Sequence, residues 1–223
     1  KAAGTLLRDV LEQDWVLDIS VTTNRPDALG IIGIAREVGL LTNTPLKLPK
    51  IRLSESKQAI SKLVKIRIDD AIGCPRYAAR LLQNVEVKPS PNWMIKRLNA
   101  VGIRAISNLV DVSNYVMMET GQPLHAFDFD TLDQGTIIVR RASAGEKFTT
   151  LDDRGHELKA NDVLICDASK PVALAGVMGG LNSEVKDTTR NVLIEAAHFE
   201  PISVRRTGKR LGINDGGWVE VAS

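Results

Sequence analysis

Three patches of this sequence carry side chains that could bind a ligand or take part in a reaction. The first consists of Ser113-Asn114 and the segment Gly121-Gln122-Pro123-Leu124-His125-Ala126-Phe127-Asp128. Gly-Gln-Pro is typical of a helix end, so His125 is predicted on the following loop, where an imidazole could meet a ligand. The alternative is a histidine that only fixes the loop through backbone hydrogen bonds, and spacing alone leaves both open.

The second patch is an apolar run that ends in two glycines, Val172-Ala173-Leu174-Ala175-Gly176-Val177-Met178-Gly179-Gly180. A strand that runs into Gly179-Gly180 lets the main chain approach a ligand closely. The alternative, which is the more common use of glycines at such a point, is packing or a tight turn. Phosphate binding is disfavoured, because no Lys followed by Ser or Thr comes after the glycines.

The third patch is Glu195, which lies inside a run predicted to be a strand, Asn191-Val192-Leu193-Ile194-Glu195-Ala196-Ala197. With the period of two in a strand, its carboxylate shares a face with Leu193 and Ala197. A carboxylate among apolar residues is costly unless it is paired or binds a polar group. Glu195 therefore lies either at a sheet edge in water or in the wall of a pocket.

A fourth feature is electrostatic and lies near the end of the chain. Four cations, Arg205, Arg206, Lys209 and Arg210, are spaced so that they crowd adjoining faces of a predicted helix. They could contact RNA phosphates. The alternative is a solvated helix end whose cations complement the helix dipole.

Composition and missing motifs exclude several other classes of protein. Of 223 residues, 43% are hydrophobic and 25% charged, and the net charge is +2, so any nucleic-acid contact is expected to be local. Nucleotide-binding loops and zinc-hydrolase motifs are absent, and the three histidines lie too far apart to predict a metal site. Cys74 and Cys166 form no CxxC motif and are expected to be reduced and buried. The spacing of the histidines leads us to expect no metal, and the reduced cysteines a cytoplasmic location. We expect no membrane association, because no apolar run approaches the about 20 residues of a membrane span and no signal peptide opens the chain.

The elements that must position these residues follow from periodicity and from cap signals. Asp27 is predicted to cap a helix that stops at Asn43-Thr44-Pro45. A second helix is predicted to begin at Ser90-Pro91 and to end at Gly102. A third is predicted to begin at Glu200-Pro201 and to end at Gly212. A further helix is predicted over 109–119. The predicted strands cover 15–19, 64–68, 76–82, 136–141, 163–166 and 192–197, with turns at 152–155 and at the paired glycines. Strands and helices mix without strict alternation, which indicates an α+β layered domain.

Several of these segments are recognisable together. They resemble, in the right order, motifs of the bacterial phenylalanyl-tRNA synthetase β subunit. The matching blocks are Thr22-Thr23-Asn24-Arg25-Pro26-Asp27 with Gly33-Ile34-Ala35-Arg36-Glu37-Val38, Arg104 through Asn114 with Gly121 through Asp128, Ala175 through Gly180, and Val192 through Ala197. After Leu211-Gly212-Ile213 the sequence departs from the family's pattern.

The resemblance implies three segments. Residues 1–49 correspond to the end of the family's B1 region, a strand plus a helix, and the polar residues 49–58 read as a linker. Residues 59–213 correspond to the B3/B4 editing domain, with mixed and antiparallel sheets packed with helices in a ββα-like sandwich. Residues 214–223 are a divergent or added tail, and Lys1 at the start predicts a piece of a longer protein.

In the family the B3/B4 domain hydrolyses tyrosine wrongly attached to tRNA(Phe). The resemblance implies His125, Glu195 and Asn114 as catalytic residues. It implies Ser113, where relatives commonly have threonine, and Gly179 as substrate-binding residues. A non-catalytic module that docks tRNA or holds the subunits together is the alternative, with the four cations 205, 206, 209 and 210 as its tRNA contacts. A free-standing editing protein is disfavoured by the B1-like residues 15–46.

The resemblance also implies cofactors and partners. This part of the family needs no cofactor, whereas the whole synthetase uses ATP and Mg²⁺. The partners are the acceptor end of tRNA(Phe) with its tyrosyl ester and, in the α2β2 synthetase, the α subunit. The isolated chain is expected to be a monomer.

Overall fold

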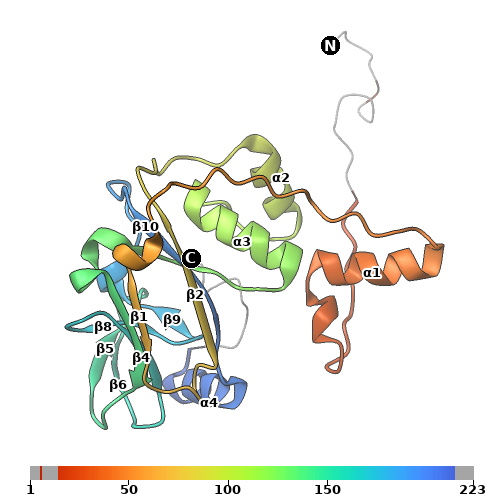
Figure 1. Cartoon of the computed structure of the whole chain (residues 1–223). Coiled ribbons are helices and arrows are strands. Elements are labelled where there is room, and N and C mark those ends of the chain that lie inside the picture. The colour runs from red at the N-terminus through yellow and green to blue at the C-terminus, as the bar shows by residue number, and fades with distance from the viewer. Residues whose placement is uncertain (1–5, 7–14, 214–223) are drawn as a thin grey trace.

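The computed structural model describes residue 6 and residues 15–213 (Figure 1). Two sheets and a hairpin form the body of the molecule, and the helices lie around it. Helix α1 (Ile31–Thr42) lies to one side and is joined to the body by a long segment without regular structure. The other helices are α2 (Asn92–Ala100), α3 (Asn108–Thr120) and α4 (Pro201–Leu211), and the short 3-10 helices are η2 (Pro26–Leu29), η3 (Ile60–Lys62), η4 (Phe129–Thr131), η5 (Asp133–Gly135) and η6 (Leu181–Ser183).

The larger sheet has five strands in the order β1-β4-β7-β8-β9. Its first two strands are parallel and the remaining pairs are antiparallel. The bounds are β1 (Lys65–Ile68), β4 (Thr136–Arg141), β7 (Val163–Cys166), β8 (Pro171–Leu174) and β9 (Met178–Gly179).

The smaller sheet has three antiparallel strands in the order β2-β10-β3. Strand β10 (Val192–His198) is its centre, between β2 (Arg76–Leu82) and β3 (His125–Asp128). A separate hairpin joins β5 (Lys147–Thr149) to β6 (Gly155–Glu157).

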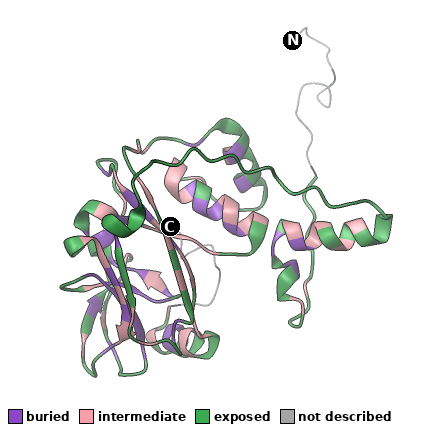
Figure 2. Ribbon diagram, viewed as in Figure 1, coloured by how far each residue is buried: buried purple, intermediate pink, exposed green. Residues whose placement is uncertain are grey.

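The two sheets face each other across a shared core, and Figure 2 shows buried residues on several of their strands. Phe127 and Leu193 of the smaller sheet pack in one cluster with Ile137, Val139, Val163, Ile165, Val172 and Ala173 of the larger sheet. Each fully buried side chain of this size contributes about 1.5–3 kcal/mol. The opposite face of the larger sheet is also buried, against Phe148 of the hairpin and Val204 of α4. All four residues of β7 are therefore buried, as in a middle layer.

The structure confirms the α+β fold class and most of the elements predicted from periodicity. Strand β2, strand β4 and strand β7 have the predicted bounds, and β10 extends one residue beyond its prediction. The predicted glycine ends are also present, because Gly102, Gly121 and Gly212 have φ of 81°, 76° and 68°, a backbone conformation that favours glycine. Glu200 caps α4 by accepting from the backbone N–H groups of Ile202 and Ser203.

Predictions in the B1-like segment are partly wrong. Residues 15–19 form no strand, and Trp15 is 89% exposed, because alternation supplies no partner strand for backbone hydrogen bonds. Asp27 does not cap α1: it lies in η2 and pairs with Arg25, and Gly30 is the N-cap. Asn43 ends α1 in the left-handed conformation, as the stop signal predicts.

The structure differs from three further predictions. Ser90 is not the cap of α2, because its hydroxyl donates to buried Asp111 at 2.5 Å and Pro91 takes the cap position. Gly179-Gly180 is not a turn: Gly179 belongs to β9, and the turn lies at Gly176, whose φ is 68°. The alternation at β1 buries Val64 but leaves Ile66 41% exposed, because β1 is an edge strand.

Candidate functional site

A buried carboxylate lies at the centre of the smaller sheet. Glu195 stands in the middle of β10, with β2 on one side and β3 on the other, and is 6% exposed. Its Oε2 accepts a hydrogen bond from the hydroxyl of Tyr77 at 2.7 Å. Burial raises the pKa of Glu195 to about 7, and the bond from Tyr77 opposes that rise. The wet sheet edge is therefore wrong, and the carboxylate lies within the protein.

An imidazole lies directly opposite this carboxylate. His125 is the first residue of β3, not a loop residue as predicted, and it is the register partner of Glu195. Its ring meets Phe127 edge-on, with centroids 4.4 Å apart at 76°. Burial lowers the pKa of His125 to about 4, so the ring is neutral near pH 7. A neutral imidazole has one donor and one acceptor nitrogen and can hold a hydroxyl or a water.

Backbone from the other sheet approaches the same imidazole. A Cβ at Gly179 would lie 2.7 Å from Cε1 of His125 and 2.9 Å from Cδ1 of Leu151. The Leu151 N–H donates to the Gly179 carbonyl at 3.0 Å, which fixes β9 in this position. Gly179 is therefore required by close approach, and its main chain borders the space beside His125.

The two predicted residues of α3 are buried but are not joined to this group by any hydrogen bond between described residues. Ser113 donates its hydroxyl to the Leu109 carbonyl at 3.1 Å, one turn earlier in the same helix. Asn114 is 2% exposed, and its Oδ1 finds no partner among the described residues. A buried amide oxygen without a donor is rare in a folded protein and marks an unused acceptor. Helix α3 contacts β3, the strand that carries His125.

Sequence reasoning missed Tyr77. It lies on β2 in register with Ala197, two residues from Glu195 on the same face of the sheet. Its partner is 118 residues away in sequence, and only the pairing of β2 with β10 brings them together. The strand prediction for 76–82 is the only signal that placed Tyr77 on a sheet, and it does not indicate which strand lies beside it.

The cationic end of the chain divides into two kinds of residue. Arg210 forms an ion pair with Asp162, which also accepts from Thr207 at 2.8 Å. Burial opposes ionisation of Asp162, but the bonds from Lys159 N–H, Arg210 and Thr207 outweigh it and lower the pKa of that carboxyl. Arg210 therefore ties α4 to the body, which is a structural role. The side chains of residues 205, 206 and 209 are exposed and form no ion pair with a described residue.

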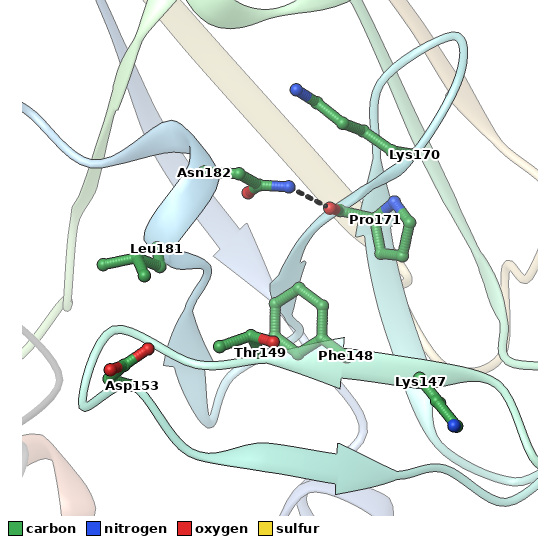
Figure 3. A pocket seen from close by; sticks show the side chains of 8 residues that line it. All are labelled: Lys147, Phe148, Thr149, Asp153, Lys170, Pro171, Leu181 and Asn182. Atoms are coloured by element: carbon green, nitrogen blue, oxygen red, sulfur yellow. Dashed lines mark hydrogen bonds between the residues drawn. The ribbon is translucent and has the colours of Figure 1, made fainter.

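A hollow beside this group does not include Glu195 or His125 in its lining. It has a volume of about 510 Å³ and lies between the β5–β6 hairpin and η6, with Lys147 and Lys170 at its two ends (Figure 3). Asn182 spans it by donating to the Pro171 carbonyl at 2.9 Å. The hollow is connected to the group around His125 through the backbone. Thr150, which follows the lining residue Thr149, pairs with Gly180, the residue after Gly179. The remaining lining residues are Phe148, Thr149, Asp153 and Leu181.

The described residues contain no group of three or more His, Cys, Asp or Glu side chains that could hold a metal ion. Cys74 and Cys166 are both free and buried, as predicted. In the same part of the chain, none of the helices combines the length and the apolar character needed to cross a lipid bilayer.

Comparison with known proteins decides the family. The sequence model described as "B3/4 domain" matches residues 73–216, which is more than half of the chain. The chain belongs to the B3/4 domain family. This B3/4 chain is 52% identical over 212 residues to the phenylalanine–tRNA ligase beta subunit of Syntrophus aciditrophicus (strain SB), with 95% of the chain covered, and 48% identical over 212 residues to that of Geobacter sulfurreducens, with the same coverage.

These relatives confirm the resemblance inferred from the sequence motifs, and the beta subunit is a component of an aminoacyl-tRNA synthetase. The B3/4 chain spans about a quarter of the length of the curated relatives it matches, 26% in both cases. Among solved structures, it is similar to an N-terminal fragment of the phenylalanyl-tRNA synthetase beta subunit from Pyrococcus horikoshii. That match has 17% identity and a TM-score of 0.47, over 82% of this chain and 55% of the other. The tail after residue 213 lies outside the described residues.

Proposed function

We propose that the B3/4 domain of this chain hydrolyses the ester of tyrosine wrongly attached to tRNA(Phe). The observation that carries the proposal is the buried Glu195 carboxylate opposite the neutral His125 ring, with the Gly179 main chain beside them. Tyrosine differs from phenylalanine by a hydroxyl alone, so a site that rejects one of them must pair that group with a buried polar partner. Glu195 is such a partner.

The reaction needs a water held against the ester carbonyl. In this proposal Glu195 accepts the phenol O–H, and the His125 ring holds the attacking water or a ribose hydroxyl. The unused Oδ1 of Asn114 supplies a further acceptor, and the main chain at Gly179 borders the space beside His125. Ser113 is assigned to substrate binding by the family resemblance. Water adds to the carbonyl carbon, and the bond to the ribose oxygen breaks. The products are tyrosine and a tRNA with a free terminal hydroxyl.

Positioning is sufficient in this mechanism, because an aminoacyl ester is already reactive and needs no covalent enzyme intermediate. The neutral imidazole fits this assignment, since a ring whose pKa is about 4 is a weak base near pH 7. His125 therefore acts mainly by orienting groups through hydrogen bonds. Activity then depends on the geometry of the site more than on a strong base.

A tRNA-docking module is the second candidate, favoured by the exposed cations 205, 206 and 209 of α4. The two candidates differ in which residues govern the result. As a hydrolase, the chain removes tyrosine from Tyr-tRNA(Phe) and loses this activity in Glu195→Gln. As a docking module, it binds tRNA with a strong salt dependence that Arg205→Glu weakens and Glu195→Gln does not change.

The experiment measures deacylation of Tyr-tRNA(Phe) and binding of uncharged tRNA(Phe) in parallel. Glu146→Gln is the matched control for Glu195→Gln, because Glu146 pairs with Arg140 at 2.7 Å outside this site. Loss of deacylation in Glu195→Gln alone supports the hydrolase. Binding without hydrolysis by the wild type supports the docking module and contradicts the hydrolase.

The larger protein to which the relatives correspond supplies the remaining partners in this proposal. These are the α subunit, with two copies of each subunit, and ATP with Mg²⁺ for aminoacylation, whereas the B3/4 chain itself acts as a monomer. The described residues hold no acidic cluster suited to Mg²⁺, so no step of aminoacylation is assigned to them. The cytoplasm is the compartment in which such an enzyme meets its tRNA.

A further inference from the structure

The hydrogen bond between Tyr77 and Glu195 assigns a role to a residue that the mechanism above does not use. We propose that Tyr77 is a positioning residue for tyrosine selection: its hydroxyl holds one oxygen of Glu195 and leaves the other as an acceptor for the substrate phenol. This inference rests on the proposed function, because it concerns the same carboxylate. Tyr77 acts through Glu195 and is not itself assigned to touch the substrate.

The number of donors around Glu195 supports this role. A carboxylate can accept about four hydrogen bonds, and a buried one is costly when they are not made. Among the described residues, Tyr77 alone donates to it, to Oε2 at 2.7 Å. Acceptor capacity on Oε1 is therefore left for a ligand, and the substrate phenol supplies the missing donor.

The direction of the bond is fixed by the surroundings of Tyr77. Burial, followed by the charge of Glu195, raises the pKa of Tyr77 well above its usual value, so the phenol keeps its proton and donates. The same bond lowers the pKa of Glu195 against the effect of burial. Tyr77 thereby favours the ionised carboxylate, which is the better acceptor for a phenol.

Few other groups near the carboxylate titrate. On the strands beside β10, Tyr77 and His125 share the face of Glu195, whereas Arg76, Arg80 and Asp128 alternate onto the opposite face. Cys74 precedes β2 and lies close enough for the charge of Glu195 to act on it. Burial, and then the charge of Glu195, raises the pKa of Cys74 to about 11, so the thiol stays neutral in the working range. The facing sheet contributes aliphatic side chains to the shared core. Ionisation of Glu195 between pH 6 and 9 is therefore the change that governs tyrosine selection.

The test uses Tyr77→Phe, with Tyr115→Phe as the matched control. The chain has two tyrosines, and Tyr115 accepts from Arg97 on the surface of α2 and α3 instead. Binding of L-tyrosine and L-phenylalanine is measured from pH 6 to pH 9. In Tyr77→Phe we expect the preference for tyrosine to fall about tenfold at pH 7, as for the loss of a hydrogen bond to a charged group, and to recover towards pH 9. Tyr115→Phe should match the wild type.

Titration of the Glu195 side chain by carbon-13 NMR provides a readout that needs no ligand. Its pKa should rise in Tyr77→Phe and stay unchanged in Tyr115→Phe. An unchanged titration and pH profile, or tighter binding of tyrosine by Tyr77→Phe, would overturn the inference, since the latter means that Tyr77 occupies the ligand's place. Failure of the proposed function gives a different result from failure of this inference. In that case the wild type does not prefer tyrosine, but the pKa of Glu195 still rises in Tyr77→Phe.

Discussion

Replacing Glu195 by glutamine should stabilise the fold at alkaline pH. Glutamine keeps the shape and an oxygen that can accept from Tyr77, but it removes the ionisation. The buried carboxyl has a pKa of about 7 against 4.5 for an ordinary glutamate, so the folded state holds its proton more tightly than the unfolded state. Stability from this group is fully present below pH 4.5 and is lost as pH rises through 7.

The size of the effect follows from that difference in pKa. It corresponds to about 3 kcal/mol of unfolding free energy between pH 4.5 and pH 8. Burial of His125 works in the opposite direction, because its pKa falls from 6.5 to about 4 and stability is lost as pH falls through that range. Its contribution is smaller than that calculation gives, because His125 as a residue is only half-buried. The wild type should therefore show a flattened stability profile between pH 4.5 and 6.5.

Urea unfolding at pH 5 and pH 8 measures the effect. Relative to the wild type, Glu195→Gln should gain about 2.5 kcal/mol more at pH 8 than at pH 5. Glu146→Gln is the control: the hydrogen bond from Arg140 lowers the pKa of Glu146, so the effect of its substitution should be equal at the two values. An equal effect of Glu195→Gln at both pH values would mean that the carboxylate is ionised throughout, and would refute this reasoning.

Three further substitutions test separate parts of the account. Gly179→Ala should lower tyrosyl-ester hydrolysis at least tenfold in a deacylation assay, because its methyl group would lie 2.7 Å from Cε1 of His125 and displace the ring. Arg210→Ala should cost about 3 kcal/mol by thermal unfolding, because it leaves the buried Asp162 carboxylate without its cation. Arg205→Glu should leave stability within about 0.5 kcal/mol, and under the second candidate function it should reduce the salt dependence of tRNA binding by about one phosphate contact. Equal stability of Arg210→Ala and the wild type, or an unchanged salt dependence of Arg205→Glu, would contradict these assignments.

Local patterns were sufficient to predict most of the elements. Alternation predicted β2, β4 and β7, whose side chains pack on one or both faces of a sheet. Glycines in the sequence predicted the ends of α2, α3 and α4. In the structure these glycines have a positive φ, a left-handed conformation that strongly favours glycine. The strand at 15–19 failed for the complementary reason, since a strand needs a partner and alternation does not provide one.

The site was only partly predictable, because its geometry depends on pairing between distant segments. Glu195 and His125 were identified as residues, but their opposition arises from the register of β10 with β3. Alternation placed Glu195 on one face with Leu193 and Ala197, but it did not predict whether that face is buried or in water. The packing of the two sheets buries it. Tyr77 could not be placed at all without the pairing of β2 with β10. From the sequence, the four cations of α4 could not be assigned different roles. Only the structure shows that, among the described residues, Arg210 forms an ion pair with Asp162 and the other three do not.

In the proposed function, Glu195 selects tyrosine by accepting a hydrogen bond from its phenol. The most direct measurement is the ratio of the hydrolysis rate constants for Tyr-tRNA(Phe) and Phe-tRNA(Phe) at pH 8, in the wild type and in Glu195→Gln. We expect the wild type to remove tyrosine faster by roughly 10- to 150-fold, as for one hydrogen bond to a charged group, and the ratio to fall to near one in the variant. Equal ratios in the two proteins would contradict it.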